Sequence, residues 1–472
     1  MFPPITASHL RVMKDLGRYV LNVGLSLLLL VVGDGILRAD PVEIADPFNV
    51  LNQSQLAGEF FGFRPKAETN GVVLSLQSIS DLLGNTTGGE TRGGTYSGLL
   101  NLGLAVDLQK AVGWEGASFK NTWIWLYGDD LSQKYIRNAF TASTIAGAPA
   151  FRCYELWFQQ NLFHDVVSLR GGLIPFDTEF MMSDTANLFV NSAFGPMAIA
   201  TLNLPNGGPQ YPTATPGARL AIQPTSWLTL RTAFMQANPF EQQNNQHNFN
   251  WNFGSAGGLL NINEAAATWN KDPASKGLAG TAKVGCWFQT GEGPQGAGGE
   301  SFSYGSPTAV AYSSGFYGII DQQLYVPAAK ATDAESGKNP VSSGKDTKTP
   351  VDIPSTKGLS SFAQIGFDPQ QVSVSSFYSS AGLVYTGLIP TRDADKLGLS
   401  FAYAQMSDYL QGKAAEAGLS GASFEGVAEL TYSIRVAPAI ALQPDLQYIL
   451  HPGGTQRYGN ALVIGARAVV DF

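Results

Sequence analysis

The chain has few of the residues on which most catalytic and metal centres depend. It contains 2 cysteines and 4 histidines among 472 residues, and none of them form pairs at metal-ligand spacing. Two cysteines are too few for a disulfide framework, and strand parity puts Cys153 and Cys286 on opposite faces, so we expect free thiols. Three of the histidines, His164, His247 and His451, fall in predicted turns or polar connections. We therefore expect no metal site and no cofactor.

Long apolar runs are equally scarce. The longest, residues 19–32 (YVLNVGLSLLLLVV), follows Arg11, Lys14 and Arg18 and is too short for a confident membrane helix. A basic segment before a short apolar run is typical of a secretory signal peptide, with cleavage predicted after Ala39. An uncleaved anchor is the alternative. No other run is long enough, so a mature chain that crosses a membrane must cross as a closed barrel.

Charge is also sparse, since only 14% of residues are charged and the net charge is −8. Acidity of this size argues against nucleic acid as a partner. In contrast, glycine and aromatic residues are plentiful, with 53 Gly, 27 Phe, 17 Tyr and 8 Trp. This composition favours a β-rich protein with little helix surface.

The clearest pattern lies at the C-terminal end, where apolar and other residues alternate. Side chains on a strand alternate between two faces, so one face of this segment is apolar and the other contains Arg467 and Asp471. A membrane-barrel strand has this pattern over roughly 9–11 residues. A final Phe472 is typical of strands that the outer-membrane assembly machinery reads. A soluble β-sandwich is the alternative. The apolar set is Leu462, Ile464, Ala466, Ala468, Val470 and Phe472.

Alternating segments of about ten residues, separated by turn residues, recur from about residue 97. They predict an all-β protein, a transmembrane antiparallel β-barrel of about 16 strands (16–18). The expected domains are a signal peptide (1–39), an N-terminal segment (40–96) that forms a plug or a periplasmic extension, and the barrel (97–472).

Three long polar connections interrupt the alternation, and we expect them on one rim of the barrel. They cover 237–279, 291–314 and 327–358. The last is rich in Lys and Ser and has too few apolar residues to offset the entropy of ordering.

Assigning the apolar parity to lipid predicts which side chains face the lumen. The set mixes carboxylates, cations and two Trp in nearly balanced charge. Such a wall suits neutral polyhydroxy solutes, because carboxylates accept from hydroxyls, cations donate to them and a Trp face packs against a pyranose. An anion pore should be more basic. In the alternative interpretation these charges only solvate the wall. The predicted lumen residues are Glu155, Trp157, Arg170, Arg219, Arg231, Lys283, Trp287, Glu425, Glu429, Asp445 and Arg467.

The order of several motifs between about residue 97 and residue 472 resembles the OprB-type carbohydrate-selective porins. This resemblance implies an outer-membrane barrel through which mono- and small oligosaccharides diffuse passively into the periplasm, without a cofactor. The motifs are YELWF at 154–158, LRGG at 169–172, YPTATPGARL at 211–220, DQ at 321–322, YTGLIPTR at 385–392, LQPDLQYI at 442–449 and PGG at 452–454.

Three alternatives to a sugar porin differ in kind. A general or ion-preferring porin needs only a different constriction, and a structural or adhesive barrel needs a plug, for which residues 40–91 are the candidate. A barrel hydrolase is disfavoured, because Glu425 and Glu429 are about 13 Å apart along one strand, too far for paired carboxylate catalysis. The expected partners are small carbohydrates, outer-membrane lipid and the barrel-assembly machinery, and both a monomer and a homotrimer stay open.

Overall fold

The computed structural model describes residues 54–472 except 61, 241, 243, 255–256, 273–274, 276, 292–311, 328–356, 371–372, 409–410, 413–414 and 416–422. The described residues all belong to one compact unit, Val50–Phe472. The predicted signal peptide lies outside the described residues, and so does nearly all of the predicted connection 327–358.

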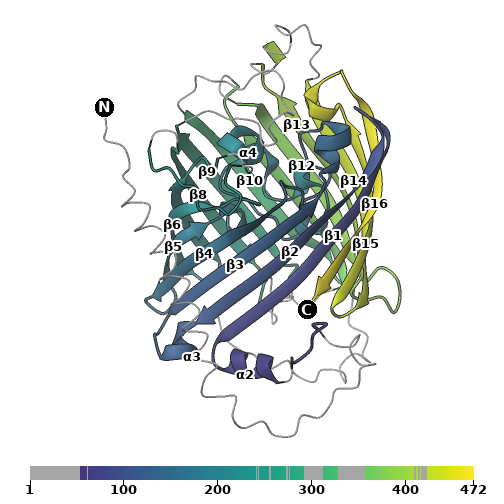
Figure 1. Cartoon of the computed structure of the whole chain (residues 1–472). Helices are drawn as coiled ribbons and strands as arrows, with labels where there is room; N and C mark the ends of the chain where they lie inside the picture. The colour runs from purple at the N-terminus through teal and green to yellow at the C-terminus, as the bar shows by residue number, and fades with distance from the viewer. Residues whose placement is uncertain are drawn as a thin grey trace. The chain divides into compact units, whose positions relative to one another are not determined.

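Sixteen antiparallel strands form a closed barrel, in which each strand bonds to the next and β1 bonds to β16 (Figure 1). The all-β barrel predicted from alternation is therefore confirmed. The strands are β1 Val72–Gly89, β2 Gly93–Asp107, β3 Ala117–Gly128, β4 Ala150–Leu162, β5 Val167–Ile174, β6 Thr215–Thr225, β7 Leu228–Gln236, β8 Leu259–Trp269, β9 Gly280–Thr290, β10 Tyr312–Tyr325, β11 Gly358–Phe367, β12 Ser375–Thr386, β13 Lys396–Met406, β14 Phe424–Ala437, β15 Ile440–Leu450 and β16 Gly459–Asp471.

Helices are few and short. None in the described part of the chain is both long and apolar enough to cross a membrane. The α-helices are α2 Phe63–Thr69, α3 Leu108–Val112 and α4 Ala198–Asn203, and the 3-10 or π turns are η2 Ser132–Ile136, η3 Phe176–Thr178, η4 Ala186–Leu188, η5 Ser192–Phe194, η6 Pro205–Gly207 and η8 Pro452–Gly454.

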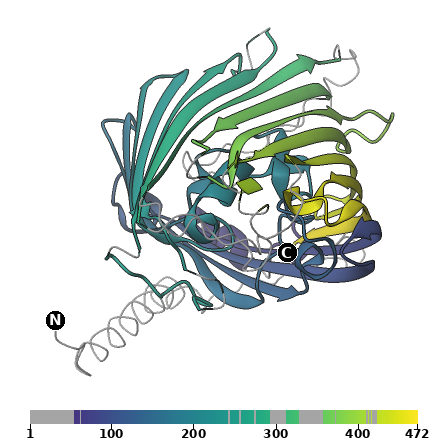
Figure 2. The same cartoon turned by 90° about the horizontal axis from the view of Figure 1, so that it is seen from above.

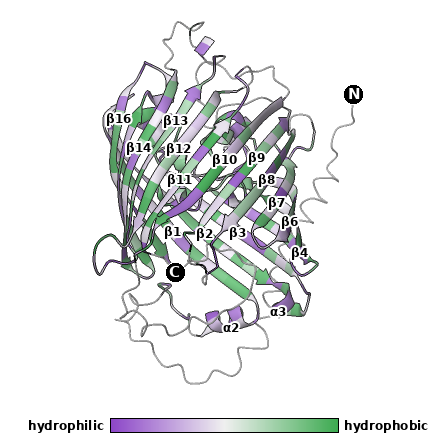
Figure 3. Cartoon of the chain, turned by 180° about the vertical axis from the view of Figure 1, so that it is seen from behind, coloured by the Kyte–Doolittle hydropathy of each residue, from purple (hydrophilic) through white to green (hydrophobic). Residues whose placement is uncertain are grey.

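The period-2 alternation sets which side chains face outward. Hydrophobic and hydrophilic residues are interleaved along the strands (Figure 3). On β15, Leu442 and Tyr448 are exposed on the outer face, whereas Gln443 and Gln447 are buried on the inner face. The same alternation leaves Ile464 of β16 exposed and outward, as predicted.

The barrel begins earlier in the chain than the sequence indicates. β1 pairs with β16 from Gln77 opposite Asp471 to Gly89 opposite Gly459, so residues 72–96 belong to the wall and form no plug. The predicted boundary at residue 97 is wrong because serines interrupt the outward stripe of β1. One of them, Ser80, has its hydroxyl 3.0 Å from that of Tyr96 on β2.

A bulge in β4 also changes a prediction. Thr122 pairs with Glu155 but Trp123 pairs with Cys153, so Tyr154 is the extra residue and the faces exchange at this point. The Tyr154 hydroxyl therefore turns inward and donates to Asp177 at 2.8 Å. Cys153 faces outward, as Cys286 on β9 does, and the two thiols are free but do not lie on opposite faces.

The up-and-down order of the strands separates the connections into two sets. We call the end where β1 begins and β16 ends the terminal rim, and the opposite end the loop rim. The strand order puts the end of β10 and the start of β11, which flank the predicted connection 327–358, at the terminal rim. The prediction that all long connections share one rim is therefore wrong, because an even-numbered strand of this barrel always ends at the terminal rim.

The predicted connection 237–279 is also shorter than expected, because β8 (Leu259–Trp269) lies within it. The outward face of β8 carries polar residues, which hid its stripe. Asn263 Nδ2 donates to Asn261 Oδ1 at 2.8 Å, and Asn261 Nδ2 donates to the Ala233 carbonyl of β7 at 3.0 Å. The two amides are therefore hydrogen-bonded to each other and to the backbone of β7.

Two loop-rim connections fold into the barrel instead of outward. We call residues 129–149, between β3 and β4, and 175–214, between β5 and β6, the infolded segments. Seen from above, they lie within the ring of strands (Figure 2). Their apolar side chains form most of the buried core together with small inward residues of the wall, including Phe140, Phe180, Phe189, Phe194, Met197 and Ile199.

Candidate functional site

Carboxylates on the inner face of the wall hold the infolded segments in place. Glu425 of β14 accepts hydrogen bonds from the backbone N–H groups of Ala139 at 2.7 Å, Phe140 at 2.9 Å and Gly453 at 2.5 Å. Such charge-assisted bonds to backbone donors are about twice as strong as neutral ones. Glu425 is fully buried, so it anchors a segment and does not meet water.

Glu429, four residues further along the same face of β14, does the same for the second infolded segment. It accepts from the backbone N–H of Val190 at 2.6 Å and of Asn191 at 2.9 Å. On β15, Asp445 accepts from Gln447 Nε2 at 2.7 Å and is also buried. Glu425, Glu429 and Asp445 face inward as predicted, but the infolded segments cover them. Their assignment to a wetted lumen face is therefore wrong.

Arg467 and Asp81 are paired across the seam that closes the barrel. The two residues are directly opposite on β16 and β1, and the guanidinium donates to both carboxylate oxygens at 2.8 Å. Asp81 also accepts from the hydroxyl of Ser143, and Arg467 donates to that of Thr144, both in an infolded segment. Arg467 thus faces inward, as predicted, and links the seam to the segment.

The remaining predicted lumen residues, apart from Trp287, gather on β4 to β9. We call this group the charged wall. Counting three members that the predicted set omitted (Lys120, Glu179 and Glu264), it consists of Lys120, Glu155, Trp157, Arg170, Glu179, Arg219, Arg231, Glu264 and Lys283.

Glu155 lies at one end of the charged wall. Its carboxylate is 2.8 Å from Lys120 Nζ of β3 and accepts from Thr122 Oγ1 at 2.9 Å and Trp157 Nε1 at 3.1 Å. The sequence alone does not place Lys120 in the lumen, because Trp123 and Trp125 share one face of this strand and leave the outward face ambiguous. The register with β4 settles it, since Lys120 pairs with Trp157.

Glu179 of the second infolded segment joins two cations of the wall. Arg219 of β6 contacts it with Nε at 2.6 Å and Nη2 at 2.9 Å, and Arg170 Nη2 of β5 is 3.4 Å away. Burial raises the pKa of Glu179, but Arg170 and Arg219 lower it by more, so the pKa falls to about 2. Glu179 is therefore ionised at any physiological pH. Glu179 is surrounded in the sequence by apolar residues, and this composition indicates that the 175–214 connection is buried and does not form a surface loop.

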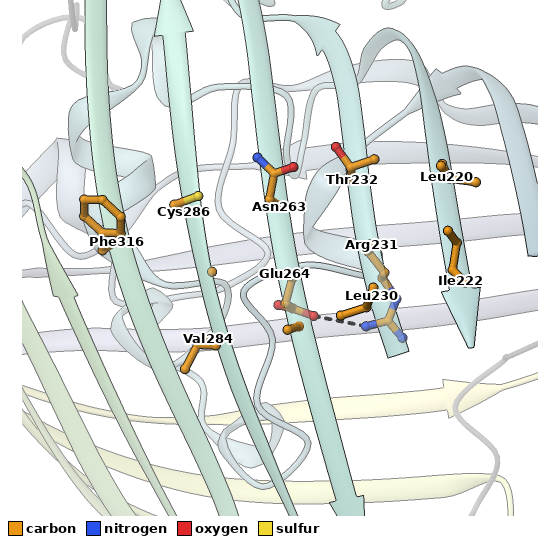
Figure 4. Close-up of a pocket in the computed structure, with 12 residues that line it drawn as sticks. Leu220, Ile222, Leu230, Arg231, Thr232, Asn263, Glu264, Val284, Cys286 and Phe316 are labelled. Carbon is orange, nitrogen blue, oxygen red and sulfur yellow. Dashed lines mark hydrogen bonds and ion pairs between the residues drawn. The ribbon is translucent and has the colours of Figure 1, made fainter. Parts of the chain in front are cut away.

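Arg231 of β7 and Glu264 of β8 form the next pair, at 3.0 Å (Figure 4). The other oxygen of Glu264 accepts from the backbone N–H of Met181 and from the hydroxyl of Tyr317, both at 3.0 Å. Beyond them, Lys283 Nζ of β9 donates to the Met182 carbonyl at 2.6 Å. Glu264 was missed because it lay in the predicted loop 237–279.

The two predicted lumen tryptophans are not available for stacking. Trp157 is covered by the guanidinium of Arg170, whose central carbon is 3.8 Å from the ring centroid. Trp287 is only 2% exposed and packs beside Tyr317, with Gly315 so close that a Cβ there would be 2.1 Å from the indole. Both rings face inward as predicted, but the predicted packing of their faces against a sugar does not fit these environments.

A cavity of about 550 Å³ lies beside Arg231 and Glu264 but opens on the outer side of β6 to β10. Most of its lining residues belong to the outward-facing set, and they come from β6, β7, β8, β9 and β10 (Figure 4). It is therefore separate from the lumen. Its outward lining includes Leu220, Ile222, Leu230, Val284 and Phe316.

Among the described residues, no group of three His, Cys, Asp or Glu is placed to hold a metal ion. The chemistry of the charged wall is binding chemistry. It offers guanidinium and ammonium donors, paired with carboxylates, on the inner face of a barrel.

Comparisons with known proteins agree with this geometry. A model of the carbohydrate-selective porins, OprB family, matches residues 91–472. Porin B of Pseudomonas aeruginosa is 23% identical over 457 residues, covering 89% of this chain and 92% of the relative. The putative porin QuiX of Acinetobacter baylyi is 22% identical over 458 residues, covering 91% and 95%.

The high-pH structure of Pseudomonas putida OprB has the same fold. It is similar with a TM-score of 0.72 at 22% identity, covering 89% of this chain and 99% of that one. A closed 16-strand barrel, an inward charged wall and a family match over most of the sequence lead to one conclusion: this chain belongs to the OprB family of carbohydrate-selective porins.

Proposed function

We propose that this protein is an outer-membrane porin through which mono- and small oligosaccharides diffuse down their gradient into the periplasm. The observation that carries the proposal is the charged wall on the inner face of a closed barrel. Its guanidinium and ammonium groups donate to sugar hydroxyls in a narrowed lumen. Passive diffusion needs no energy source or cofactor.

The two rims support an orientation. Outer-membrane barrels have short turns on the periplasmic side and longer loops outside. The terminal rim carries the short turns 163–166, 226–227 and 438–439, so we assign it to the periplasm. In this orientation the infolded segments enter from the cell exterior, and the ends of β10 and β11 that flank the predicted connection 327–358 lie on the periplasmic side.

In this proposal the 1–39 signal peptide directs export, and the assembly machinery recognises the last strand and Phe472. Outer-membrane lipid would then cover the outward stripe. The stoichiometry, monomer or homotrimer, does not affect the route within one barrel.

Liposome swelling tests the function directly. Refolded protein is reconstituted and challenged with glucose, a disaccharide, a neutral amino acid similar in size to glucose and a small salt, all at matched osmolarity. Glucose should enter faster than the amino acid. Equal rates for all small solutes would indicate a general porin, and no swelling with any solute would indicate that the infolded segments close the barrel.

A further inference from the structure

The charged wall carries a net positive charge although the whole chain is acidic. It contains five cations and three carboxylates, which gives +2, against −8 for the chain. Nearby, Asp184 of the second infolded segment pairs with Lys271 at 3.7 Å. Asp177 and Asp321 are each 7% exposed and accept from the hydroxyls of Tyr154 and Ser183, so they lie below the water surface. The cations are Lys120, Arg170, Arg219, Arg231 and Lys283, and the carboxylates are Glu155, Glu179 and Glu264.

In two of these ion pairs the cation lies closer to the water than its carboxylate partner. In the first pair, the Lys120 side chain is 31% exposed and that of Glu155 is 4% exposed. In the next, Arg231 is 17% exposed and Glu264 is fully buried. At Glu179 the order is reversed, since this side chain is 20% exposed, against 11% for Arg170 and 3% for Arg219. A solute in the lumen therefore meets Lys120, Arg231 and Arg170 with one partly exposed carboxylate, Glu179, among them.

The acidic residues on the opposite side of the barrel do not restore the balance at the water surface. Glu425 and Glu429 of β14 are 0% and 1% exposed, and backbone N–H groups of the infolded segments occupy their oxygens. A solute cannot reach them. The predicted lumen residues are nearly balanced in charge. Those that reach the water are mostly cations, so the surface that faces the lumen is basic.

We propose that the charged wall recognises sugar acids, that is, polyhydroxylated carboxylates such as gluconate, and favours them over neutral sugars of the same size. This inference rests on the proposed function and refines its substrate class. Charge-assisted bonds from Lys120, Arg170 and Arg231 to a carboxylate are stronger than those to a hydroxyl. The hydroxyls of such a solute suit the same donors and the amide of Gln159, which already accepts from Arg170 at 2.7 Å.

The test uses the full-length mature protein in planar bilayers and in liposomes. Reversal potentials are measured across tenfold gradients of potassium chloride and potassium gluconate, and glucose swelling is recorded on the same preparation. The expected result is a chloride-to-potassium permeability ratio above 1. Gluconate should also slow glucose entry more than an equal concentration of a neutral hexose does.

Lys120→Gln is the informative variant, because Thr122 and Trp157 continue to donate to Glu155. The permeability ratio should fall by about twofold, as expected when one unit charge several ångströms from the path is removed in a water-like dielectric. Lys283→Gln is a second variant, for which a similar fall is expected because it removes another cation of the charged wall. Lys134→Gln is the matched control, since this lysine is exposed and pairs with exposed Asp129.

The outcomes separate the inference from the function. Glucose entry with a ratio below 1, unaffected by Lys120→Gln, would overturn the preference for sugar acids and leave the sugar porin intact. Absence of both glucose entry and conductance would overturn the proposed function and the inference with it. A fall in the ratio with Lys134→Gln as large as with Lys120→Gln would show that the charge acts through the rim and not the wall.

Discussion

The guanidinium of Arg170 lies over the indole of Trp157, 3.8 Å from the ring centroid, and the indole Nε1 donates to Glu155 at 3.1 Å. The indole of Trp157 therefore positions the guanidinium of Arg170 through a cation–π contact. The side chain that a solute meets at this point is that of Arg170, whose Nε and Nη2 also bond to Gln159.

Replacing Trp157 should therefore act through Arg170. Trp157→Phe keeps a ring beneath the guanidinium, and we expect glucose entry close to that of the native protein. Trp157→Ala removes the ring and a cation–π contact of about 1–2 kcal/mol, so both heat stability and the rate of entry should change. Liposome swelling of the two variants decides the matter. A large loss of sugar selectivity with Trp157→Phe would instead favour direct stacking of sugar on the indole.

Trp287 should affect stability and leave selectivity unchanged. It is buried beside Tyr317, so Trp287→Ala opens a cavity and should lower the free energy of unfolding by about 3–5 kcal/mol. The ratio of glucose to amino-acid entry in the folded fraction should not change. Heat-modified mobility on gels measures the first quantity and swelling the second. Trp125→Ala, at an exposed outward position, is the control.

Glu429→Gln should loosen the second infolded segment. The carboxylate accepts from two backbone N–H groups, and an amide can replace only one acceptor, which should weaken the anchor by about 1.5–3 kcal/mol. We expect faster disaccharide entry relative to glucose, with the barrel still formed. Glu68→Gln, on the exposed surface of α2, provides the control. Unchanged disaccharide entry would mean that the core packing alone holds the segment.

Asp368, in the connection after β11, should make stability depend on pH. Its Oδ2 accepts from Asn203 at 3.1 Å and Ser313 at 3.3 Å, while Oδ1 has no partner among the described residues. Burial raises its pKa from 3.8 to about 7. The folded protein therefore binds a proton that the unfolded chain has lost, and stability falls as pH rises from about 4 to about 7.

Asp368→Asn should remove this contribution and make the protein about 1–3 kcal/mol more stable at pH 8, because no buried charge is left unsatisfied. Thermal unfolding at pH 5 and pH 8 measures the difference. Some pH dependence should persist, because burial also raises the pKa of Asp177 to about 6. Asp393→Asn, at an exposed site near Lys357, is the control. An equal pH dependence in Asp368→Asn and the native protein would contradict the prediction.

Arg467→Ala should destabilise the closed barrel. It leaves Asp81 as an uncompensated buried charge at the β1–β16 seam, a change that typically lowers the free energy of unfolding by about 3–5 kcal/mol. Arg92→Ala, at an exposed position in the turn between β1 and β2, removes the same charge as a control. Gel mobility after heating at increasing temperature gives both midpoints. Similar midpoints for the two variants would show that backbone pairing alone holds the seam.

The sequence by itself determined the architecture and the outward face of most strands. A strand places alternate residues on opposite faces, so a regular stripe such as that of β15 specifies lipid on one side without any tertiary information. The prediction from alternation failed where outward residues were not apolar, as for Ser80 on β1 and Asn261 on β8. It also failed where a bulge at Tyr154 exchanged the faces.

Only the tertiary structure decided which inward residues meet water. The alternation predicts which face of a strand a side chain is on, but it does not predict how exposed that side chain is. Glu155, Glu425 and Glu429 therefore look alike in the sequence. The infolded segments make the difference, because their backbone N–H groups cover the carboxylates of β14 while Lys120 and Arg231 stay partly exposed. Those segments lie far from β14 in the chain, and no local pattern can specify a contact made only when the barrel closes around them.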